Sequence, residues 1–255
     1  GSTPTLSNVI QQFSFASSGN TTDYGDLTAA SSGVNGSGNS TRGLFAGFGP
    51  APGSGVIDLI DLSTTGNATD FGDLSVARQN PGAHSNSTRC LFSTGYTNTS
   101  QNVIDYVTVA TTGNATDFGD YVFPVTNCAS TGSSTRCLIA GGIRAPGPGA
   151  VLNDIGFVEI ATTGNTTDFG DLTGTESSFA ATSSSTRSVF GGGSPTSNEL
   201  QYVTTRGVFG GGASPSLSNV MDYITIASTG NAEDWGDLLA ANRGLGATSN
   251  SHGGL

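Results

Sequence analysis

The sequence predicts an all-β fold in which four-stranded blades close into a β-propeller, and three observations support this prediction. Two short markers recur along nearly the whole chain of 255 residues. Apolar residues come in short runs rich in Gly and β-branched side chains, and no segment has the 3.6-residue apolar period of a helix. The first and last segments are two parts of one repeat.

The two markers define the repeat. The part of Thr-Gly-Asn-x-Thr-Asp-Phe-Gly-Asp-Leu that starts at Gly spans 66–74, 113–121 (where Tyr121 replaces the Leu) and 164–172, with looser copies at 19–27 and 230–238. The second marker, Ser-Thr-Arg, begins at Ser40, Ser87, Ser134 and Ser185, and a shortened copy begins at Thr205. Cutting at the Thr of this marker divides a single domain, 1–255, into units 252–255 plus 1–40, 41–87, 88–134, 135–185, 186–204 and 205–251. Five units are close to 47 residues long, and unit 186–204 is stunted.

The ends of the chain predict a closed ring. Segment 3–10 (TPTLSNVI) matches segment 214–221 (SPSLSNVM), so the chain begins and ends inside one unit. We expect the two termini to close the ring, because closure hides the sheet edges that an open array exposes.

Each full unit is expected to hold four strands, which fits one blade. In unit 88–134 these are 88–92, 102–109, a third from 116, and a fainter fourth before the next Thr-Arg. Adjacent apolar residues such as Leu44-Phe45 predict that the first strand is innermost, between two blades. The third-strand aromatics are expected to fill the gaps between blades: Tyr24, Phe71, Phe118, Phe169 and Trp235.

The stunted unit leaves the number of blades open. It retains the first two strands and lacks the rest. We favour six blade positions, one of them two-stranded, and the alternative is a five-bladed ring with an extra hairpin.

Several motifs together resemble a known family. They are a Gly doublet after the first strand (Ala140-Gly141-Gly142), an Asp-Tyr second strand (Asp105-Tyr106, Asp222-Tyr223), an aromatic third strand, and Arg78 or Arg243. This pattern resembles the kelch repeat. Its residue sequence is similar to kelch-like repeats in tail-fibre and virion proteins of bacteriophages, particularly marine cyanophages. The resemblance covers nearly the whole chain except the stunted unit, and it implies a virion location.

Composition excludes some classes of function. The chain has no Lys and a net charge of −11, which disfavours binding to nucleic acid. No window has the roughly 18–20 consecutive apolar residues of a membrane span. Cys90 and Cys137 occupy equivalent positions, where we expect small buried side chains.

The acidic residues recur in pairs in every full unit, which favours a structural role over an active site. We expect them to accept backbone N–H bonds in turns or to pair with Arg, and Ca²⁺ binding is the alternative. The pairs are Asp23/Asp26, Asp70/Asp73, Asp117/Asp120, Asp168/Asp171 and Asp234/Asp237. The Arg of the second marker is the expected partner, and an anion site at the channel mouth is its alternative role. This series is Arg42, Arg89, Arg136, Arg187 and Arg206.

Repeated Asn-x-Ser/Thr sequences fall mostly inside the markers. Turn chemistry explains them, and we expect none to be glycosylated. They begin at Asn20, Asn39, Asn67, Asn86, Asn98, Asn114 and Asn165.

The sequence predicts a binding module and not an enzyme. It contains no catalytic motif, and a glycan lyase or hydrolase would need Glu159, Glu176 or Glu199 to come together. The loops vary between units more than the strands do, so we place ligand contacts there. The candidates are Tyr96, Asn98, Arg144, Gln79, Asn80 and His84. We expect a carbohydrate-binding or receptor-binding module that recognises host surface polysaccharide, without a cofactor or resident metal. The alternative is an assembly module that docks other virion proteins.

Overall fold

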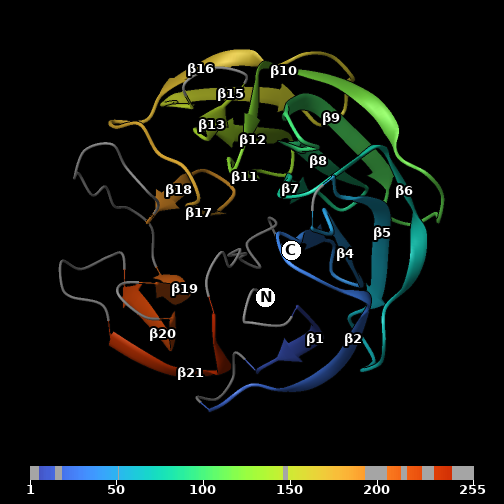
Figure 1. The fold of residues 1–255 in the computed structure, drawn as a ribbon, viewed down its shortest axis with the longest axis vertical. Helices are drawn as coiled ribbons and strands as arrows, with labels where there is room; N and C mark the ends of the chain where they lie inside the picture. Colours follow the sequence, from blue (N-terminus) through green and yellow to red (C-terminus); the bar gives the residue numbers. More distant parts are fainter. Residues whose placement is uncertain are drawn as a thin grey trace.

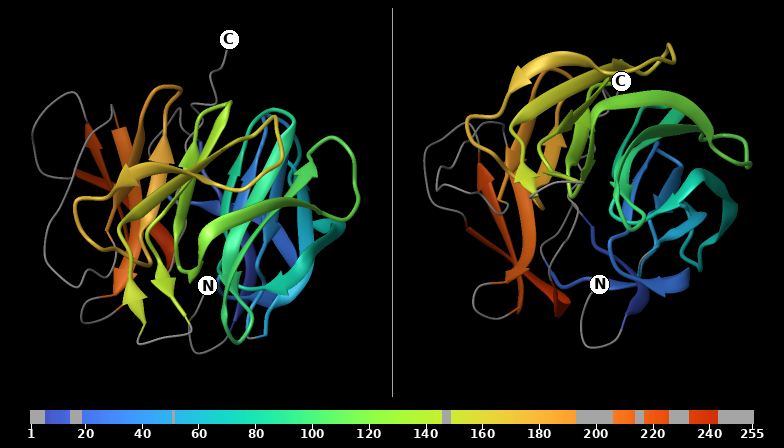
Figure 2. Two further views of the ribbon diagram at one scale, coloured as in Figure 1. Left: turned by 90° about the horizontal axis from the view of Figure 1, so that it is seen from above. Right: turned by 45° about the horizontal axis from the view of Figure 1, so that its top comes forward.

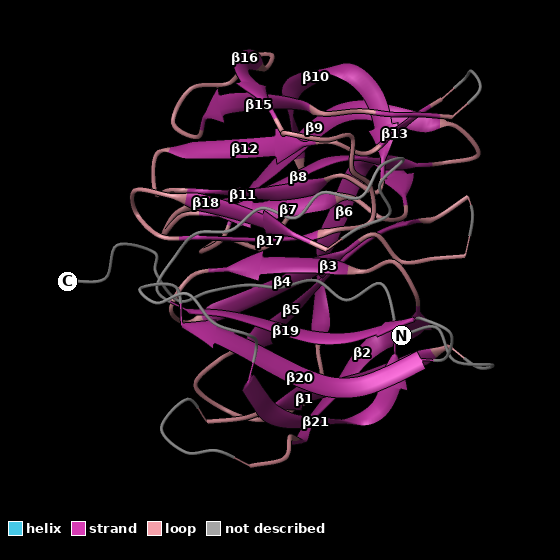
Figure 3. Cartoon of the chain, turned by 90° about the vertical axis from the view of Figure 1, so that its left-hand side faces the viewer, coloured by secondary structure: helices cyan, strands magenta, loops and turns pink. Residues whose placement is uncertain are grey.

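Every regular element of the described chain is a β-strand, which confirms the all-β prediction. The computed structural model describes residues 6–14, 19–50, 52–145, 149–192, 206–213, 217–225 and 233–242, the last three as backbone only. Figure 3 shows strands joined by loops in these residues, without a helix. The expected closure by the two termini depends on 1–5 and 243–255, which lie outside the described residues.

The strands are short and follow one another closely. They are β1 (Ser7–Gln12), β2 (Thr22–Ser31), β3 (Asn35–Gly38), β4 (Arg42–Ala46), β5 (Ser54–Asp61), β6 (Thr69–Arg78), β7 (Gly82–Ser85), β8 (Arg89–Tyr96), β9 (Ser100–Thr108), β10 (Thr116–Thr126), β11 (Ala129–Gly132), β12 (Arg136–Ala140), β13 (Ile143–Arg144), β14 (Ala150–Val151), β15 (Asp154–Glu159), β16 (Thr167–Asp171), β17 (Ala180–Ser183), β18 (Ser188–Gly191), β19 (Arg206–Ala213), β20 (Leu217–Thr225) and β21 (Glu233–Asn242).

These strands form several small antiparallel sheets. The most complete have the orders β3-β4-β5-β6, β7-β8-β9-β10 and β11-β12-β15-β16, and the hairpin β13-β14 extends the second sheet beyond β10. Smaller sheets are β1-β2, β17-β18 and β19-β20-β21. The sheets follow one another around a common centre (Figure 1), and loops gather at the two ends of the strands (Figure 2).

A sheet and a sequence unit do not coincide, so our expectation that one unit forms one blade is wrong. Strand β7 belongs to unit 41–87, yet it pairs with β8 of unit 88–134. A tight turn causes this exchange, because the Asn86 side-chain oxygen accepts the backbone N–H groups of Thr88 and Arg89 at 2.9 and 2.8 Å. Each complete sheet therefore takes its first strand from the preceding unit.

The expected position of the first strand is also wrong. Strands β4, β8 and β12 lie second from the centre, and the edge strands β3, β7, β11 and β17 lie innermost. The inner strand of each of these sheets contacts the inner strand of the next sheet. At Gly82 only glycine permits this approach, since a Cβ there would lie 2.0 Å from the Ser130 hydroxyl oxygen.

The hydrophobic core lies between neighbouring sheets. One cluster joins Leu44, Ile57 and Phe71 to Cys90 and Phe92 of the next sheet. A second cluster repeats this pattern one sheet further on, with Leu91, Ile104, Phe118, Cys137 and Ile139 among its members. Stacking on both neighbours thus buries both faces of the middle sheets.

The third-strand aromatics fill these gaps in three sheets, as expected. Tyr24, Phe71 and Phe118 are 8%, 3% and 2% exposed. Phe169 is 54% exposed, so the expectation is wrong at this position. Trp235 lies in β21, of which only the backbone is described.

Each of the three Thr-Gly-Asn turns in the described residues lies on the outer strand of the preceding sheet, and we call this the outer-turn contact. The turn donates two backbone N–H bonds to the strand, and its Asn side chain accepts one N–H from the strand. The three contacts join Gly66, Asn67 and Ala68 to Tyr24 and Asp26; Gly113, Asn114 and Ala115 to Phe71 and Asp73; and Gly164, Asn165 and Thr166 to Phe118 and Asp120, with distances of 2.7 to 3.1 Å. The Asn of the first marker therefore links sheets.

The Gly of Asp-Phe-Gly-Asp has a fixed role in this contact. Gly72 has a φ of +148°, and a Cβ there would lie 2.4 Å from the Gly113 carbonyl oxygen. Gly25 and Gly119 meet the carbonyl groups of Gly66 and Gly164 in the same way. Glycine is required at these positions by both the backbone conformation and the closeness of the turn.

The stunted unit is described only in part. Its first strand, β18, pairs with β17. Its expected second strand lies at 193–204, outside the described residues.

Candidate binding cavity

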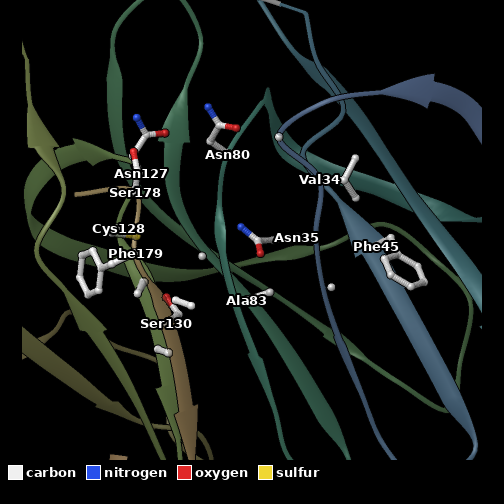
Figure 4. A pocket seen from close by; sticks show the side chains of 16 residues that line it. Val34, Asn35, Phe45, Asn80, Ala83, Asn127, Cys128, Ser130, Ser178 and Phe179 are labelled. Atoms are coloured by element: carbon white, nitrogen blue, oxygen red, sulfur yellow. The ribbon is translucent and has the colours of Figure 1, made fainter. Parts of the chain in front are cut away.

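A cavity of about 300 Å³ lies between the inner edges of four sheets. Its walls come from β3, β7, β11 and β17, from the loops that precede them, and from Phe45 on β4. Figure 4 shows Phe45 and Phe179 on opposite sides of the lining residues, with Asn35 and Ala83 between them. This volume is at the lower end of the range typical of small-molecule pockets.

Four equivalent loop residues line one part of the cavity. Gly33, Asn80, Asn127 and Ser178 each stand two residues before an inner strand, and their φ angles are +73°, +53°, +57° and +57°. Asn and Gly tolerate this left-handed conformation better than other residues. Main-chain bonds tie the loops together, because Asn80 N donates to Gly33 O at 3.0 Å and Ser178 N donates to Asn127 O at 2.9 Å. The cavity wall is therefore braced by its own backbone.

The lining combines neutral polar groups with apolar surfaces. Amides of Asn35, Asn80 and Asn127 and the hydroxyl group of Ser178 supply donors and acceptors. Phe45, Phe179 and Val34 supply apolar surface, and no described lining residue is charged. Part of the polar set is already engaged, since Asn35 Nδ2 donates to Pro81 O at 2.7 Å. Such a site suits an uncharged ligand that carries both hydroxyl groups and apolar C–H surface.

The six loop residues expected to bind ligand do not form one site. Asn80 alone among them lines the cavity. Gln79 and Tyr96 exchange backbone bonds at 3.0 and 2.9 Å, and Asn98 is exposed in a hairpin turn with a φ of +76°. Arg144 is exposed, with its guanidinium carbon 4.5 Å from the centre of the Phe123 ring.

His84 does not lie in a loop, where we expected it to contact a ligand. It lies within β7 and is only 4% exposed. Its Nε2 is 2.9 Å from the carbonyl oxygen of Ser133, on the neighbouring sheet. His84 is thus a structural link between inner strands.

Sequence reasoning missed most of the cavity wall. Asn127 and Phe179 were not selected, although Asn127 stands at the same repeat position as Asn80. Aligning the units at the residues before each inner strand would have found this ring of positions. Asn35 and Phe45 carry no such signal, because their role depends on how the sheets meet.

The repeated Asp residues serve turns and strands. Asp70, Asp117 and Asp168 accept the N–H of the Gly two residues later, at 3.0, 3.0 and 2.9 Å. This geometry agrees with the structural interpretation. Asp234 and Asp237 lie in β21, where side chains are not described. In the part of the chain with described side chains, no group of three His, Cys, Asp or Glu could hold a metal ion.

The expected pairing of marker Arg residues with these Asp residues is wrong. Arg42 donates to Val109 O at 2.9 Å and Arg89 donates to Ile160 O at 2.7 Å, each on the next sheet. Arg136 instead pairs with Glu159 at 2.6 Å, with both side chains about half exposed. Arg42 and Arg89 each reach the residue that follows the second strand of the next sheet, and its backbone carbonyl group accepts the bond. Arg187 is exposed, and Arg206 lies in β19, which is described as backbone only.

A buried ion pair joins two sheets at Arg78 and Asp105. Arg78 Nη1 lies 2.8 Å from Asp105 Oδ2, and neither side chain is exposed. Arg78 also donates to the carbonyl groups of Val76 and Phe92, both at 3.0 Å. Burial lowers the pKa of the Arg78 guanidinium, and the Asp105 carboxylate opposes this shift. The pair fixes β6 against the next sheet.

Comparison with protein-family models and with curated proteins found no match to this chain. In the described residues there is no helix that is long and apolar enough to cross a membrane. The cavity geometry therefore carries the functional argument.

Proposed function

We propose that the chain is a non-enzymatic β-propeller with six blade positions, one of them stunted, that binds carbohydrate in the central cavity. Sheets arranged in chain order around a centre support the propeller, and the offset between unit and sheet fits a ring built from repeats. The observation that carries the binding function is the uncharged wall of amide and hydroxyl groups flanked by two Phe rings.

A sugar has matching chemistry. Its hydroxyl groups both donate and accept hydrogen bonds, as amide side chains do, and its C–H faces pack on aromatic rings. Because the lining has no described charge, a neutral sugar is favoured over an acidic one. We therefore propose a neutral unit of a host surface polysaccharide as the ligand.

The biological setting is proposed from the resemblance to kelch-like repeats of phage appendages. A receptor-binding module on a virion appendage acts in many copies, so a weak single site gains by avidity. A second function, docking of other virion proteins, is favoured by the exposed aromatic edge of β16.

Glycine substitutions at the cavity test the binding function without straining the loops. Asn80→Gly and Asn127→Gly remove an amide and retain a residue that accepts positive φ. Asn98→Gly is the matched control, because Asn98 also has positive φ and lies outside the cavity. Binding is measured on an array of neutral and acidic bacterial polysaccharides, followed by titration calorimetry with the best ligand.

We expect saturable binding that weakens by about 3–10-fold in each cavity variant, since one hydrogen bond contributes roughly 0.5–1.5 kcal/mol. The control should bind as the unaltered chain does. Equal losses in all three variants, or no saturable binding by the folded chain, would reject the cavity as a carbohydrate site.

A further inference from the structure

Within the described residues, no turn covers the outer strand β16, whereas a turn covers each of its counterparts β2, β6 and β10. An outer-turn contact requires a Thr-Gly-Asn turn in the next sheet, and unit 186–204 does not contain this sequence. Phe169 is consequently 54% exposed, whereas the equivalent Phe118 is 2% exposed.

Gly170 shows that the receiving surface is nevertheless intact. It has the positive φ of its counterparts, +132°, and a Cβ there would meet no atom within 4 Å. At the equivalent Gly119, the carbonyl oxygen of the covering turn lies 2.4 Å from such a Cβ. The strand thus has the backbone shape that accommodates a turn, and no described atom lies where the turn would sit.

The side chains beside β16 also repeat a covered site. The rings of Phe157 and Phe169 meet edge to face, with their centres 5.9 Å apart. The guanidinium carbon of Arg136 lies 4.8 Å from the centre of the Phe157 ring. In the covered sheet, Tyr106 and Phe118 meet at 5.7 Å, and Arg89 lies 4.7 Å from Tyr106. The surface around Phe169 is therefore already arranged as it is beneath a turn.

We propose that the edge Phe169–Asp171 is a docking site for a Thr-Gly-Asn-x-Thr turn of another protein. The three outer-turn contacts within this chain define the required chemistry. The incoming Gly N–H bonds to Phe169 O, the N–H two residues later bonds to Asp171 O, and the Asn amide oxygen accepts from Asp171 N. Gly170 leaves room for the incoming carbonyl group, and Phe169 packs beneath the turn.

The partner is a repeat-bearing protein with an uncovered turn of this kind. A second copy of this chain fits less well, because its described turns, at Gly66, Gly113 and Gly164, already bind their own strands. This docking surface is separate from the cavity, so it does not depend on carbohydrate binding.

A hairpin peptide provides a direct test. It copies residues 103–120, which carry the turn at Gly113 and Asn114, and an added terminal disulfide holds its two strands together. It is titrated into the full, isotope-labelled chain, and amide chemical shifts are followed by NMR. The control peptide carries Asn114→Ala, and the control protein carries Gly170→Ala, whose fold is checked by circular dichroism.

We expect saturable shifts at Phe169, Gly170 and Asp171, with affinity about 3–10-fold weaker for the control peptide, which lacks one hydrogen bond. Gly170→Ala should abolish them, because its Cβ occupies the place of the incoming carbonyl. No shifts at millimolar peptide, or equal shifts with both peptides, would overturn the proposal.

Two other occupants of this edge would give different experimental results. Either result would overturn the proposal that the turn comes from another protein. Concentration-dependent dimers that disappear with Phe169→Ser would assign the edge to a second copy. Peptide binding that appears only after Asn231→Ala would assign it to the chain's own turn at 229–231, which lies outside the described residues.

Discussion

Single glycines determine how closely the sheets approach. Gly72 and Gly170 occupy the same repeat position and both have positive φ, but in the described part of the chain a turn covers Gly72 and none covers Gly170. The two positions therefore separate the cost of backbone strain from the cost of a steric clash.

Gly72→Ala should destabilise the fold more than Gly170→Ala. Strain at a positive φ costs roughly 1–3 kcal/mol at either position, and displacement of the turn adds roughly 1–3 kcal/mol at Gly72 only. Urea unfolding at equilibrium measures both values. Equal losses would show that the turn moves aside without cost.

Asp58 makes a pH-dependent contribution to the free energy of unfolding. Burial raises the pKa of its carboxyl group, against the hydrogen bonds from Thr28 N and Oγ1 at 2.8 and 2.7 Å. The folded state therefore holds this proton more tightly than the unfolded state. The stability that this adds is complete below the unfolded pKa near 3.8 and is lost as pH rises through the raised folded pKa.

Asp58→Asn removes this dependence and retains groups that can bond to Thr28. We expect the variant to gain stability relative to the unaltered chain between pH 4 and pH 7. Urea midpoints at the two pH values give the difference, and a constant difference would contradict the assignment.

At the scale of elements, strands were predictable and their grouping into sheets was not. The markers located first, second and third strands, because turn residues and β-branched runs are local signals. Innermost strands such as GAHS and ASTG contain few apolar residues, so their central position follows only from the close approach of neighbouring sheets. Phe169 was misjudged because its exposure depends on a turn that the next unit lacks.

Elements on neighbouring sheets are joined by Arg78 on β6 and Asp105 on β9. Arg78→Met leaves a buried carboxylate without its partner, which should cost about 3–5 kcal/mol. Adding Asp105→Leu should restore much of that loss, because an apolar pair needs no compensating charge.

Arg136→Met is the control for this pair, since Arg136 and Glu159 are exposed. It should change stability by about 0–1 kcal/mol. Denaturant unfolding of the four proteins tests both expectations, and a loss at Arg78 no larger than at Arg136 would disprove them.

At the scale of the whole molecule, the cores between sheets protect all three thiols. Cys90, Cys128 and Cys137 are buried and unpaired, and burial raises the pKa of each thiol. This confirms the expected small buried side chains at Cys90 and Cys137.

Native protein at pH 8 should react with a thiol reagent at least about 100-fold more slowly than protein in guanidinium chloride, where all three thiols react. Rapid labelling of any one cysteine in the native state would show that its core opens readily.

The candidate cavity was the least predictable feature of the whole molecule. Asn80 was predicted because the loops vary between units. The cavity also depends on Asn35 in the inner strand β3 and on Phe45 in its neighbour β4. Residues from four sheets converge there, and no local pattern specifies that convergence.

The offset between sequence unit and sheet has a consequence for how such genes grow. Units 41–87 and 88–134 each encode a turn that covers the sheet before it, an outer strand that receives the turn after it, and an inner strand for the sheet that follows. Duplication or deletion of one of these two units therefore preserves the contacts at its junctions with the neighbouring units. Tandem recombination between near-identical units can change the number of repeats in one step, whereas loss of part of a unit, as in 186–204, leaves an unmatched junction that selection can use.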